Sequence, residues 1–509
     1  MPPNNSITLQ SGTEELECLI RLVDAAESLL LDGDARFGAW RAAAAALKAD
    51  KDLDSLTGET ALDDLAFAFR DTWLDAAFQA TRSYLMSPPH EQPKTMPSGD
   101  KFQFDYERSS RPESLERRGL HCLSSPQDWT GFCLLFSSGM SAISTVVQVC
   151  CAHLDGAKPE SPVNLDIFGG YFETWRLLDA MHTSVLTVRY HPTNEEINRR
   201  VAGGGVDVLV IEPVAYDWDM SVFDLDRLRD AWRQAGTKHP RVVIVDTSLT
   251  AHTFGPEDLT AVFGDTPPWL VVFIRSGLKL DQQGLELSNV GVVNLFLPDG
   301  GGKKINKDGL KQKLTVNRAV TGGALTVNQT AALEAPWFLK ADQLAAFAGQ
   351  VFGNNRRLAV NIKNDGGVFS RINHPGLETA TTQTWAVSPF VVFHLSEDSQ
   401  NRHGLLVAIL VHEARLRGLP LTLGSSFGFR GHRFEVIRPH VQIRAMQDKT
   451  GLLKVAMGFR QGPTLQGVID LINEIAAYPD WPALVAAYPN VKAYVKGGFG
   501  VYVERPPRP

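Results

Sequence analysis

The sequence predicts an α/β fold built around a mainly parallel sheet, and three features of the middle of the chain support this prediction. Short apolar runs alternate with helical patterns from about residue 130 onward. The runs have the length of buried strands rather than of helices. Small and polar residues follow the ends of several runs, which is where parallel sheets bind their ligands. Strands that alternate with helices favour a sheet covered on both faces.

The composition is that of an ordinary globular protein. The 509 residues are 44% hydrophobic and 21% charged, and the net charge is −7. A negative charge of this size gives no reason to expect nucleic-acid or membrane-surface partners. The five cysteines lack metal-type spacing, as expected of thiols in a reducing cytoplasm. No signal peptide or bilayer-spanning stretch is visible, so we expect a cytoplasmic protein without a metal site.

The first hundred residues are predicted to form a helical extension and a linker. Apolar residues recur at helical spacing from residue 13 to about residue 86, and residues 40–47 are rich in alanine. We expect this extension to pack on the main body or on another subunit. Residues 87–99 contain several prolines, which predicts a linker and a domain boundary.

The middle of the chain supplies the strands and helices of the predicted sheet. Strands are predicted over residues 131–136, 164–167, 185–188, 206–211, 242–245 and 270–274. Helices are predicted over residues 141–153, 174–181, 224–235 and 256–263.

After about residue 328 the pattern predicts a smaller α+β region. Its predicted strands are 390–395, 441–446 and 452–457, and its predicted helices are 405–417 and 465–477. The tract 300–304 is predicted to be a loop. The sequence therefore predicts three parts, which are an N-terminal extension with its linker over residues 1–100, a large domain over 101–330 and a C-terminal domain over 331–509.

A lysine lies just beyond the last strand of the middle region. Strand 270–274 is followed by Arg275, Ser276, two further residues and Lys279. Partial desolvation at a strand end favours the neutral amine, which can attack a carbonyl. Enzymes that use pyridoxal 5′-phosphate (PLP) hold this cofactor as a Schiff base on such a lysine. A lysine after a strand is also commonly a solvated strand end, so the prediction depends on residues upstream.

Two motifs precede this lysine in a matching order. Ser138, Gly139 and Met140 join a strand to the start of a helix, where free N–H groups suit a phosphate. Asp246 ends strand 242–245, and a carboxylate there can pair with a protonated pyridine nitrogen. Each motif alone is also explained by ordinary helix capping. A phosphate turn, a carboxylate and a lysine in this order predict a PLP site.

These motifs resemble those of the fold-type I PLP enzymes of the cystathionine γ-synthase/γ-lyase family, over about residues 102–475. Residues 138–140 are similar to the family's Ser-Gly-Met phosphate turn, and residues 276–279 to its Ser-x-Thr-Lys. Residues 246–248 stand for its Asp-Asn-Thr, and residues 168–170 for its Tyr-Gly-Gly, whose aromatic stacks on the cofactor. The resemblance implies a PLP fold-type I (aspartate aminotransferase-like) large domain with a mainly parallel seven-stranded sheet.

The resemblance also implies the residues of the site. Lys279 would be the catalytic residue. The cofactor-binding residues of the same chain would be Ser138, Gly139, Met140, Phe168, Tyr216, Asp246, Ser248 and Ser276. Residues 106–112 are similar to a family motif whose Tyr and Arg, here Tyr106 and Arg108, reach the phosphate of a neighbouring subunit's cofactor. A homodimer or homotetramer with shared sites is therefore implied.

The sequence departs from the family pattern at several of these positions. Phe168 lacks a phenol, and Tyr171 is available three residues further on. Tyr216 replaces an Asn that contacts cofactor and substrate, and Leu278 replaces a phosphate-binding Thr. The pocket of this chain is therefore predicted to be diverged.

The residue that binds the substrate carboxylate is left open. The family's Arg aligns with Lys454, and a lysine cannot make the bidentate fork of an arginine. Either Lys454 binds the carboxylate, or Arg444 or Arg460 has taken over this role. Strand alternation could instead point Lys454 to water. Thr422, in a motif that resembles the family's Ser-Leu-Gly-Gly, is the remaining candidate for substrate binding.

The resemblance implies a PLP-dependent lyase or transferase that eliminates or replaces a group on the γ-carbon of a small amino-acid substrate. Carbon–sulfur or carbon–halide bonds are the expected targets. An unusual substrate, such as a halogenated amino acid converted to an alkyne, is compatible with the diverged pocket. The alternatives are a β-eliminating lyase or aminotransferase of the same fold, or a non-catalytic PLP-binding relative.

Overall fold

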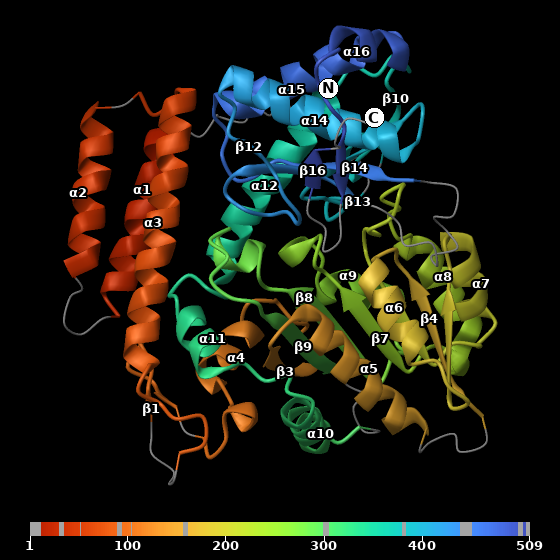
Figure 1. The fold of residues 1–509 in the computed structure, drawn as a ribbon. Helices are drawn as coiled ribbons and strands as arrows, with labels where there is room; N and C mark the ends of the chain where they lie inside the picture. The colour runs from red at the N-terminus through yellow and green to blue at the C-terminus, as the bar shows by residue number, and fades with distance from the viewer. Residues whose placement is uncertain are drawn as a thin grey trace. The chain divides into compact units, whose positions relative to one another are not determined.

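The computed structural model describes residues 12–29, 35–50, 52–88, 94–102, 104–155, 161–298, 305–378, 383–437, 450–496 and 502–504 (Figure 1). The chain forms two compact units. The terminal unit comprises Met1–Thr72, Phe347–Leu377 and Pro389–Pro509, and the large unit comprises Trp73–Ala346 and Glu378–Ser388. The terminal unit thus unites the two ends of the chain. The three-part division of the sequence stays a prediction.

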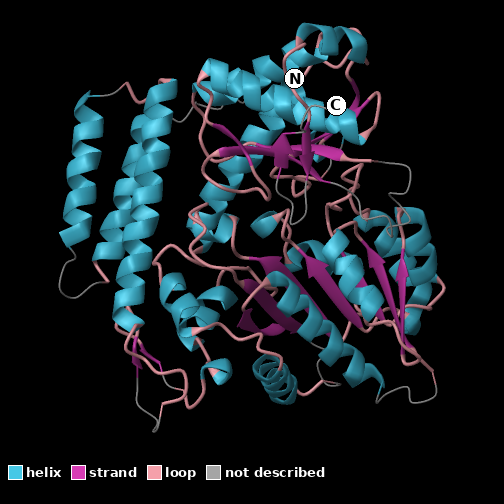
Figure 2. Cartoon of the chain, in the orientation of Figure 1, coloured by secondary structure: helices cyan, strands magenta, loops and turns pink. Residues whose placement is uncertain are grey.

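The large unit contains a seven-stranded sheet with the order β3-β9-β8-β7-β6-β4-β5 (Figure 2). Its strands are β3 (Trp129–Phe136), β4 (Val163–Phe168), β5 (Leu186–Tyr190), β6 (Val208–Ile211), β7 (Val242–Asp246), β8 (Leu270–Ser276) and β9 (Gly291–Pro298). Strands β5, β4, β6, β7 and β8 pair in parallel, whereas β9 runs antiparallel to both of its neighbours. The predicted mainly parallel sheet is confirmed. Strand β9 was not predicted.

Helices accompany this sheet as the alternating pattern predicted. They are α4 (Glu113–Leu120), α5 (Gly139–Asp155), α6 (Phe172–Ala180), α7 (Asn194–Ala202), α8 (Leu225–Ala235), α9 (Pro256–Phe263), α10 (Lys307–Val320) and α11 (Val327–Leu333). Single 3₁₀ turns are η1 (Glu107–Ser109), η2 (Gly236–Lys238), η3 (Ala251–Thr253) and η4 (Leu280–Gln282), and β1 (Lys94–Thr95) pairs with β2 (Lys101–Phe102).

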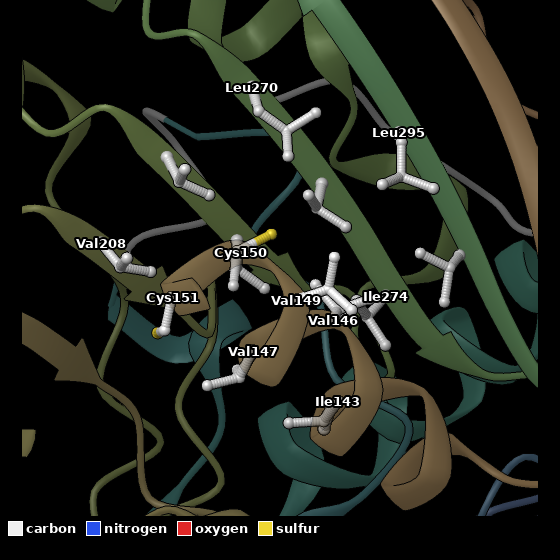
Figure 3. Close-up of a cluster of buried hydrophobic side chains, with 14 of the residues drawn as sticks. Ile143, Val146, Val147, Val149, Cys150, Cys151, Val208, Leu270, Ile274 and Leu295 are labelled. Carbon is white, nitrogen blue, oxygen red and sulfur yellow. The ribbon is translucent and has the colours of Figure 1, made fainter. Parts of the chain in front are cut away.

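Helix α5 covers one face of the sheet with apolar side chains. Ile143, Val146 and Cys150 of α5 lie in one buried cluster with Ile274 of β8 and Leu295 of β9 (Figure 3). Every second residue of the strands belongs to this cluster, because side chains alternate between the two faces of a strand. The core therefore brings the N-terminus of α5 to the edge where the parallel strands end.

The terminal unit contains a five-stranded sheet with the order β10-β11-β14-β13-β12. Its strands are β10 (Phe369–Asn373), β11 (Val391–Leu395), β12 (Leu421–Leu423), β13 (His432–Ile437) and β14 (Leu452–Ala456). Its helices include α13 (Pro375–Glu378), α14 (Gln400–Arg417), α15 (Pro463–Ala476) and α16 (Trp481–Ala487), and β15 (Tyr494–Lys496) pairs with β16 (Tyr502–Glu504). Helix α12 (Ala341–Asn361) crosses from the large unit into this one. The predicted strand 441–446 and the tract 300–304 lie outside the described residues.

Three helices form the N-terminal region, α1 (Gly12–Glu27), α2 (Ala35–Asp50) and α3 (Leu56–Thr81). Glu15 of α1 is buried, and its carboxylate accepts hydrogen bonds from Arg460 at 2.7 and 2.9 Å and from Arg430 at 3.2 Å. Burial by itself would raise the pKa of Glu15, but the two guanidinium groups outweigh it and lower the pKa to about 2. The extension therefore packs on residues from the C-terminal part of its own chain.

Candidate active site

Lys279 lies three residues beyond the end of β8, inside the large unit. Its Nζ donates a hydrogen bond to the Oγ of Ser276 at 3.1 Å. Both side chains are partly buried rather than fully exposed. Between them, a Cβ built at Gly277 would lie 2.9 Å from Val290, so only glycine fits this turn without a shift. The turn therefore holds the Lys279 amine at the edge of the sheet where the parallel strands end.

Asp246 ends β7, the parallel neighbour of β8. Its side chain is partly accessible, and its Oδ1 accepts the N–H of Ser248 at 2.9 Å. Burial raises the pKa of Asp246, although Ser248 and the positive charge of Lys279 act in the opposite direction. Ser248 also accepts the N–H of Ser276 at 3.0 Å. The carboxylate and the amine therefore belong to one connected site.

The predicted phosphate turn lies at the same edge. Helix α5 begins at Gly139, and the Oγ of Ser138 accepts the N–H of Ser141 at 3.1 Å. A Cβ built at Gly139 would lie 3.6 Å from the Cα of Ser276, so the helix terminus adjoins the end of β8. The first N–H groups of a helix have no carbonyl four residues earlier, and the dipole makes this end positive. The partly buried side chain of Met140 packs against the apolar cluster between α5 and the sheet.

Phe168 and Tyr171 lie in different surroundings. Phe168, the last residue of β4, is buried and packs on Phe223 with 5.0 Å between ring centroids. Its neighbour Ile167 belongs to the α5 face, so pleating directs Phe168 to the opposite face. Tyr171 is partly buried, and burial, Glu173 and Asp246 raise the pKa of its phenol. The negative charge of Asp246 thus acts on the phenol of Tyr171, while the stacking role of Phe168 stays a prediction.

Glu212 is a buried residue of this site that sequence reasoning did not select. It directly follows β6, and its Oε2 accepts the N–H groups of Gly170 at 3.0 Å and Tyr216 at 2.8 Å. Its Oε1 accepts the N–H of Tyr171 at 3.1 Å. Burial, and then repulsion from Asp246, raise the pKa of Glu212 to about 7. Its position after a buried parallel strand, like that of Asp246, was the signal available in the sequence.

Tyr106 and Arg108 lie at the surface of the large unit, around η1. The guanidinium of Arg108 stands over the Tyr106 ring, 5.0 Å from its centroid, and both side chains are exposed. Between them, Glu107 accepts the N–H of Val327 at 2.8 Å and ties the turn to α11. Their predicted reach into a neighbouring subunit stays a prediction.

The predicted substrate-binding residues belong to the terminal unit. Lys454 of β14 is buried and forms an ion pair with Glu435, its register partner on β13. Its amine lies 5.5 Å from the centroid of Phe390. The alternative that Lys454 points to water is therefore wrong. Thr422 is exposed on β12, and Arg444 lies outside the described residues.

Arg460, the third basic candidate, is used inside the terminal unit. In addition to Glu15, it forms an ion pair with Asp63 of α3 at 3.0 Å. The two carboxylates, together with Glu59, raise the pKa of Arg460 despite its burial. Its charge thus holds the N-terminal helices.

The described residues contain neither a cluster of metal-binding side chains nor a helix that could span a membrane. We find no group of three or more His, Cys, Asp or Glu side chains that could hold a metal ion within the described ranges. In the same ranges no helix is both long enough and apolar enough to cross a membrane.

Comparison with known proteins gives matches only at the level of structure. No family model and no curated protein matches the sequence. A methionine γ-lyase from Micromonospora echinospora is similar with a TM-score of 0.53 and 18% identity, covering 77% of this chain and 93% of that one. Cystathionine γ-lyase from yeast is similar with a TM-score of 0.54 and 16% identity, covering 79% and 98%.

A third similar structure is that of a putative O-acetylhomoserine (thiol)-lyase from Campylobacter jejuni, solved with N′-pyridoxyl-lysine-5′-monophosphate. Its TM-score is 0.52 and its identity 13%, over 79% of this chain and 92% of that one. At identities this low, the similarity is evidence for a shared fold and for nothing more. The resemblance found in the sequence is thus confirmed for the fold, which this chain shares with these lyases.

Proposed function

We propose that the protein is a PLP-dependent enzyme that eliminates or replaces a group on the γ-carbon of an amino acid. The observation that carries the proposal is the joint position of Lys279, Asp246 and the N-terminus of α5. The Lys279 amine and the Asp246 carboxylate interact electrostatically at the ends of adjacent parallel strands. The same edge of the sheet presents Gly139 next to Ser276. The fold shared with known lyases supports the reaction class.

The donors and acceptors of this site fit the chemical groups of PLP. The Lys279 amine suits the aldehyde, and the partly accessible carboxylate of Asp246 suits a protonated ring nitrogen. The turn of Ser138, Gly139 and Met140 suits the phosphate. Leu278 has no hydroxyl to donate to the phosphate, so Ser276 supplies the neighbouring side-chain hydroxyl. When bound, PLP would supply an electron sink for the charge left at Cα.

The residues of the chain can handle the protons of such a reaction. With PLP bound, the neutral Nζ of Lys279 would take the proton of substrate Cα and return it to the bound substrate and cofactor. Neutral again, Nζ would then take the proton of Cβ, so that the group on the γ-carbon can leave with its bonding electrons. Ser276 Oγ, at 3.1 Å, orients this amine. The phenol of Tyr171 donates a hydrogen bond to Glu173 at 2.6 Å, and its raised pKa keeps it protonated. Tyr171 therefore acts as a proton-bearing donor rather than as a base.

The pocket supports an unusual substrate within this class. Tyr216, in place of an Asn, lies with its ring centroid 5.5 Å from that of Tyr171. An aromatic ring thus stands where the resemblance implies an amide that contacts cofactor and substrate. We therefore include small, unsaturated or halogenated γ-substituted amino acids among the substrates that we propose.

Covalent labelling tests the proposal directly. Purified protein supplied with PLP should gain an absorbance band near the visible edge, and borohydride reduction followed by peptide mapping should place the label on Lys279. Lys279→Ala should lose both signals, whereas Lys311→Ala, an exposed lysine of α10, should keep them. Label on another lysine would sink the proposal. Mass spectrometry of products from a panel of γ-substituted amino acids then separates elimination, replacement and transamination.

A further inference from the structure

The carboxylate of Glu212 connects two loops at the edge of the sheet. Gly170 and Tyr171 belong to the turn between β4 and α6, and Tyr216 belongs to the segment after β6. All three N–H groups donate to this one side chain, at 2.8 to 3.1 Å. A buried carboxylate with three such donors is a strong local connection, because hydrogen bonds to an ionised group are stronger than neutral ones.

The two glycines of the first loop pack too closely against the second loop to be replaced by a larger residue without a shift. A Cβ built at Gly169 would lie 2.6 Å from the Cδ of Glu212. A Cβ built at Gly170 would lie 2.6 Å from the Cβ of Asp217 and 2.7 Å from the carbonyl oxygen of Tyr216. The loops therefore interlock through backbone atoms, and a side chain at position 169 would push the carboxylate away from its donors.

The connection determines where two aromatic rings lie. Tyr171 and Tyr216 each follow directly from an N–H group held by Glu212, and their rings meet edge to face at 79°. The negative charge of Asp246 contributes to the raised pKa of the Tyr171 phenol. Loss of the Glu212 bonds would free both backbone segments and, with them, the ring pair.

We propose that Glu212 is a positioning residue whose carboxylate latches these two loops together and so holds the Tyr171–Tyr216 ring pair at the edge of the sheet where β4 and β6 end. The relevance of this latch to catalysis rests on the proposed function, whereas the latch itself rests on the contacts alone.

The latch is also sensitive to pH. The charge of Asp246 on β7 acts on Glu212, and the Tyr171 phenol interacts with both carboxylates. The positive charge of Lys279 acts on Asp246 in turn. Burial and Asp246 raise the pKa of Glu212 to about 7. Opening of the two loops would return the carboxyl to water, where its pKa is lower, so opening becomes easier and the latch weakens as pH rises through about 7.

Hydrogen exchange measured by mass spectrometry tests the latch without any enzymatic activity. In Glu212→Gln, exchange in the peptides covering residues 169–174 and 212–218 should rise together, by about tenfold or more, since charged hydrogen bonds are lost. In the wild type, exchange of both peptides, corrected for its intrinsic pH dependence, should become faster as pH rises through about 7. Glu212→Gln should lose this extra pH dependence.

Matched variants separate the latch from general loosening. Gly169→Ala should reproduce the exchange pattern of Glu212→Gln, whereas Gly255→Ala, with no atom within 4 Å of the new Cβ, should not. Asp207→Asn removes a buried carboxylate that accepts the N–H of Asn164 at 3.0 Å, and it should leave both peptides unchanged. If Glu212→Gln does not fold, the wild-type pH series still decides.

Two outcomes would overturn the latch. One is exchange that rises in only one of the two peptides, and the other is wild-type exchange without the pH dependence described. These results are independent of borohydride labelling at Lys279. If Lys279 is labelled but the two peptides do not change together, the proposed function stands and the latch is wrong. If the two peptides change together but Lys279 is not labelled, the latch stands and the proposed function is wrong.

Discussion

At the scale of single residues, this protein buries charged side chains in pairs. Lys454 and Glu435 face each other across β14 and β13, next to the rings of Phe390 and Phe427. A buried charge that loses its partner costs far more than the pair contributes. The same pairing limits the role predicted for Lys454, because Glu435 already balances its charge.

We expect Lys454→Met to destabilise the protein by about 3–5 kcal/mol, since Glu435 would remain buried and unpaired. The double variant Lys454→Met/Glu435→Gln should recover most of this loss in urea unfolding. The exposed Lys363→Met should change stability by less than about 0.5 kcal/mol. If Lys454 also binds the substrate carboxylate, KM should rise about ten- to hundredfold in both Lys454 variants. An unchanged KM would leave Arg444 as the predicted residue.

A second prediction at this scale concerns Glu212 and pH. Its pKa in the folded protein, about 7, lies above the ordinary value of 4.5, so the folded state binds more protons between these two values. The contribution of Glu212 to stability is therefore largest below 4.5 and falls as pH rises through about 7. Between about pH 4.5 and 7, the wild type should lose on the order of 3 kcal/mol relative to Glu212→Gln. If the free energies of unfolding of the wild type and of Glu212→Gln changed equally with pH, the raised pKa of Glu212 would be wrong.

At the scale of elements, α1 is held to the terminal unit by one buried carboxylate. The carboxylate of Glu15 accepts hydrogen bonds from both Arg460 and Arg430, and Arg460 also forms an ion pair with Asp63 of α3. Glu59 of α3 accepts the N–H of Thr464 at 3.1 Å, next to the start of α15. The two helices therefore depend on charges that lie more than 350 residues away in the sequence.

We expect Glu15→Gln to destabilise the terminal unit by about 3–5 kcal/mol, because Arg430 and Arg460 lose their buried counter-charge. Limited proteolysis should then release α1 first. Glu17→Gln, on the exposed side of the same helix, should have an effect of less than about 0.5 kcal/mol. The pKa of Glu15 is depressed to about 2, so its contribution should be complete above about 4.5 and lost as pH falls through about 2. Intact α1 in Glu15→Gln would refute this anchoring role.

At the scale of the whole molecule, the exposed residues around η1 suit contact with a second copy of the chain. Tyr106 and Arg108 stack on each other at the surface, and Leu85 and Met86 are exposed as well. The N–H of Glu107 donates to the carbonyl of Met86 at 2.8 Å, so these side chains belong to one surface. We propose that this surface contributes to a site shared between subunits.

Subunit complementation tests the shared site. Neither Arg108→Ala nor Lys279→Ala should be active alone, because one lacks the phosphate contact and the other the amine. A mixture that has exchanged subunits should regain about a quarter of wild-type activity, because only one site of each hybrid dimer is intact and hybrids make up about half of a random mixture. No recovery after verified exchange would mean that each chain builds its own site.

The sequence by itself determined much of the large unit. Alternating apolar runs and helical patterns predicted β3 to β8 and α5, and the residues that follow strand ends predicted Asp246 and Lys279. The predictions of these elements succeeded because strand length and burial are local properties, whereas the roles of Asp246 and Lys279 stay predictions. Strand β9 was missed because only the 3₁₀ turn η4, and no α-helix, lies between β8 and β9 in the described residues 277–290, so β9 falls outside the alternation of strands and helices on which the prediction depended.

Only the tertiary structure decided which side chains meet. The pleat of β4 turns Phe168 toward Phe223, whereas the charge of Asp246 acts on the phenol of Tyr171. The order of the sheet brings Glu212 to two loops, and the terminal unit pairs Glu15 with Arg460. The physical reason is that contacts between distant segments depend on strand order, pleat and the packing of units, which local sequence patterns do not specify.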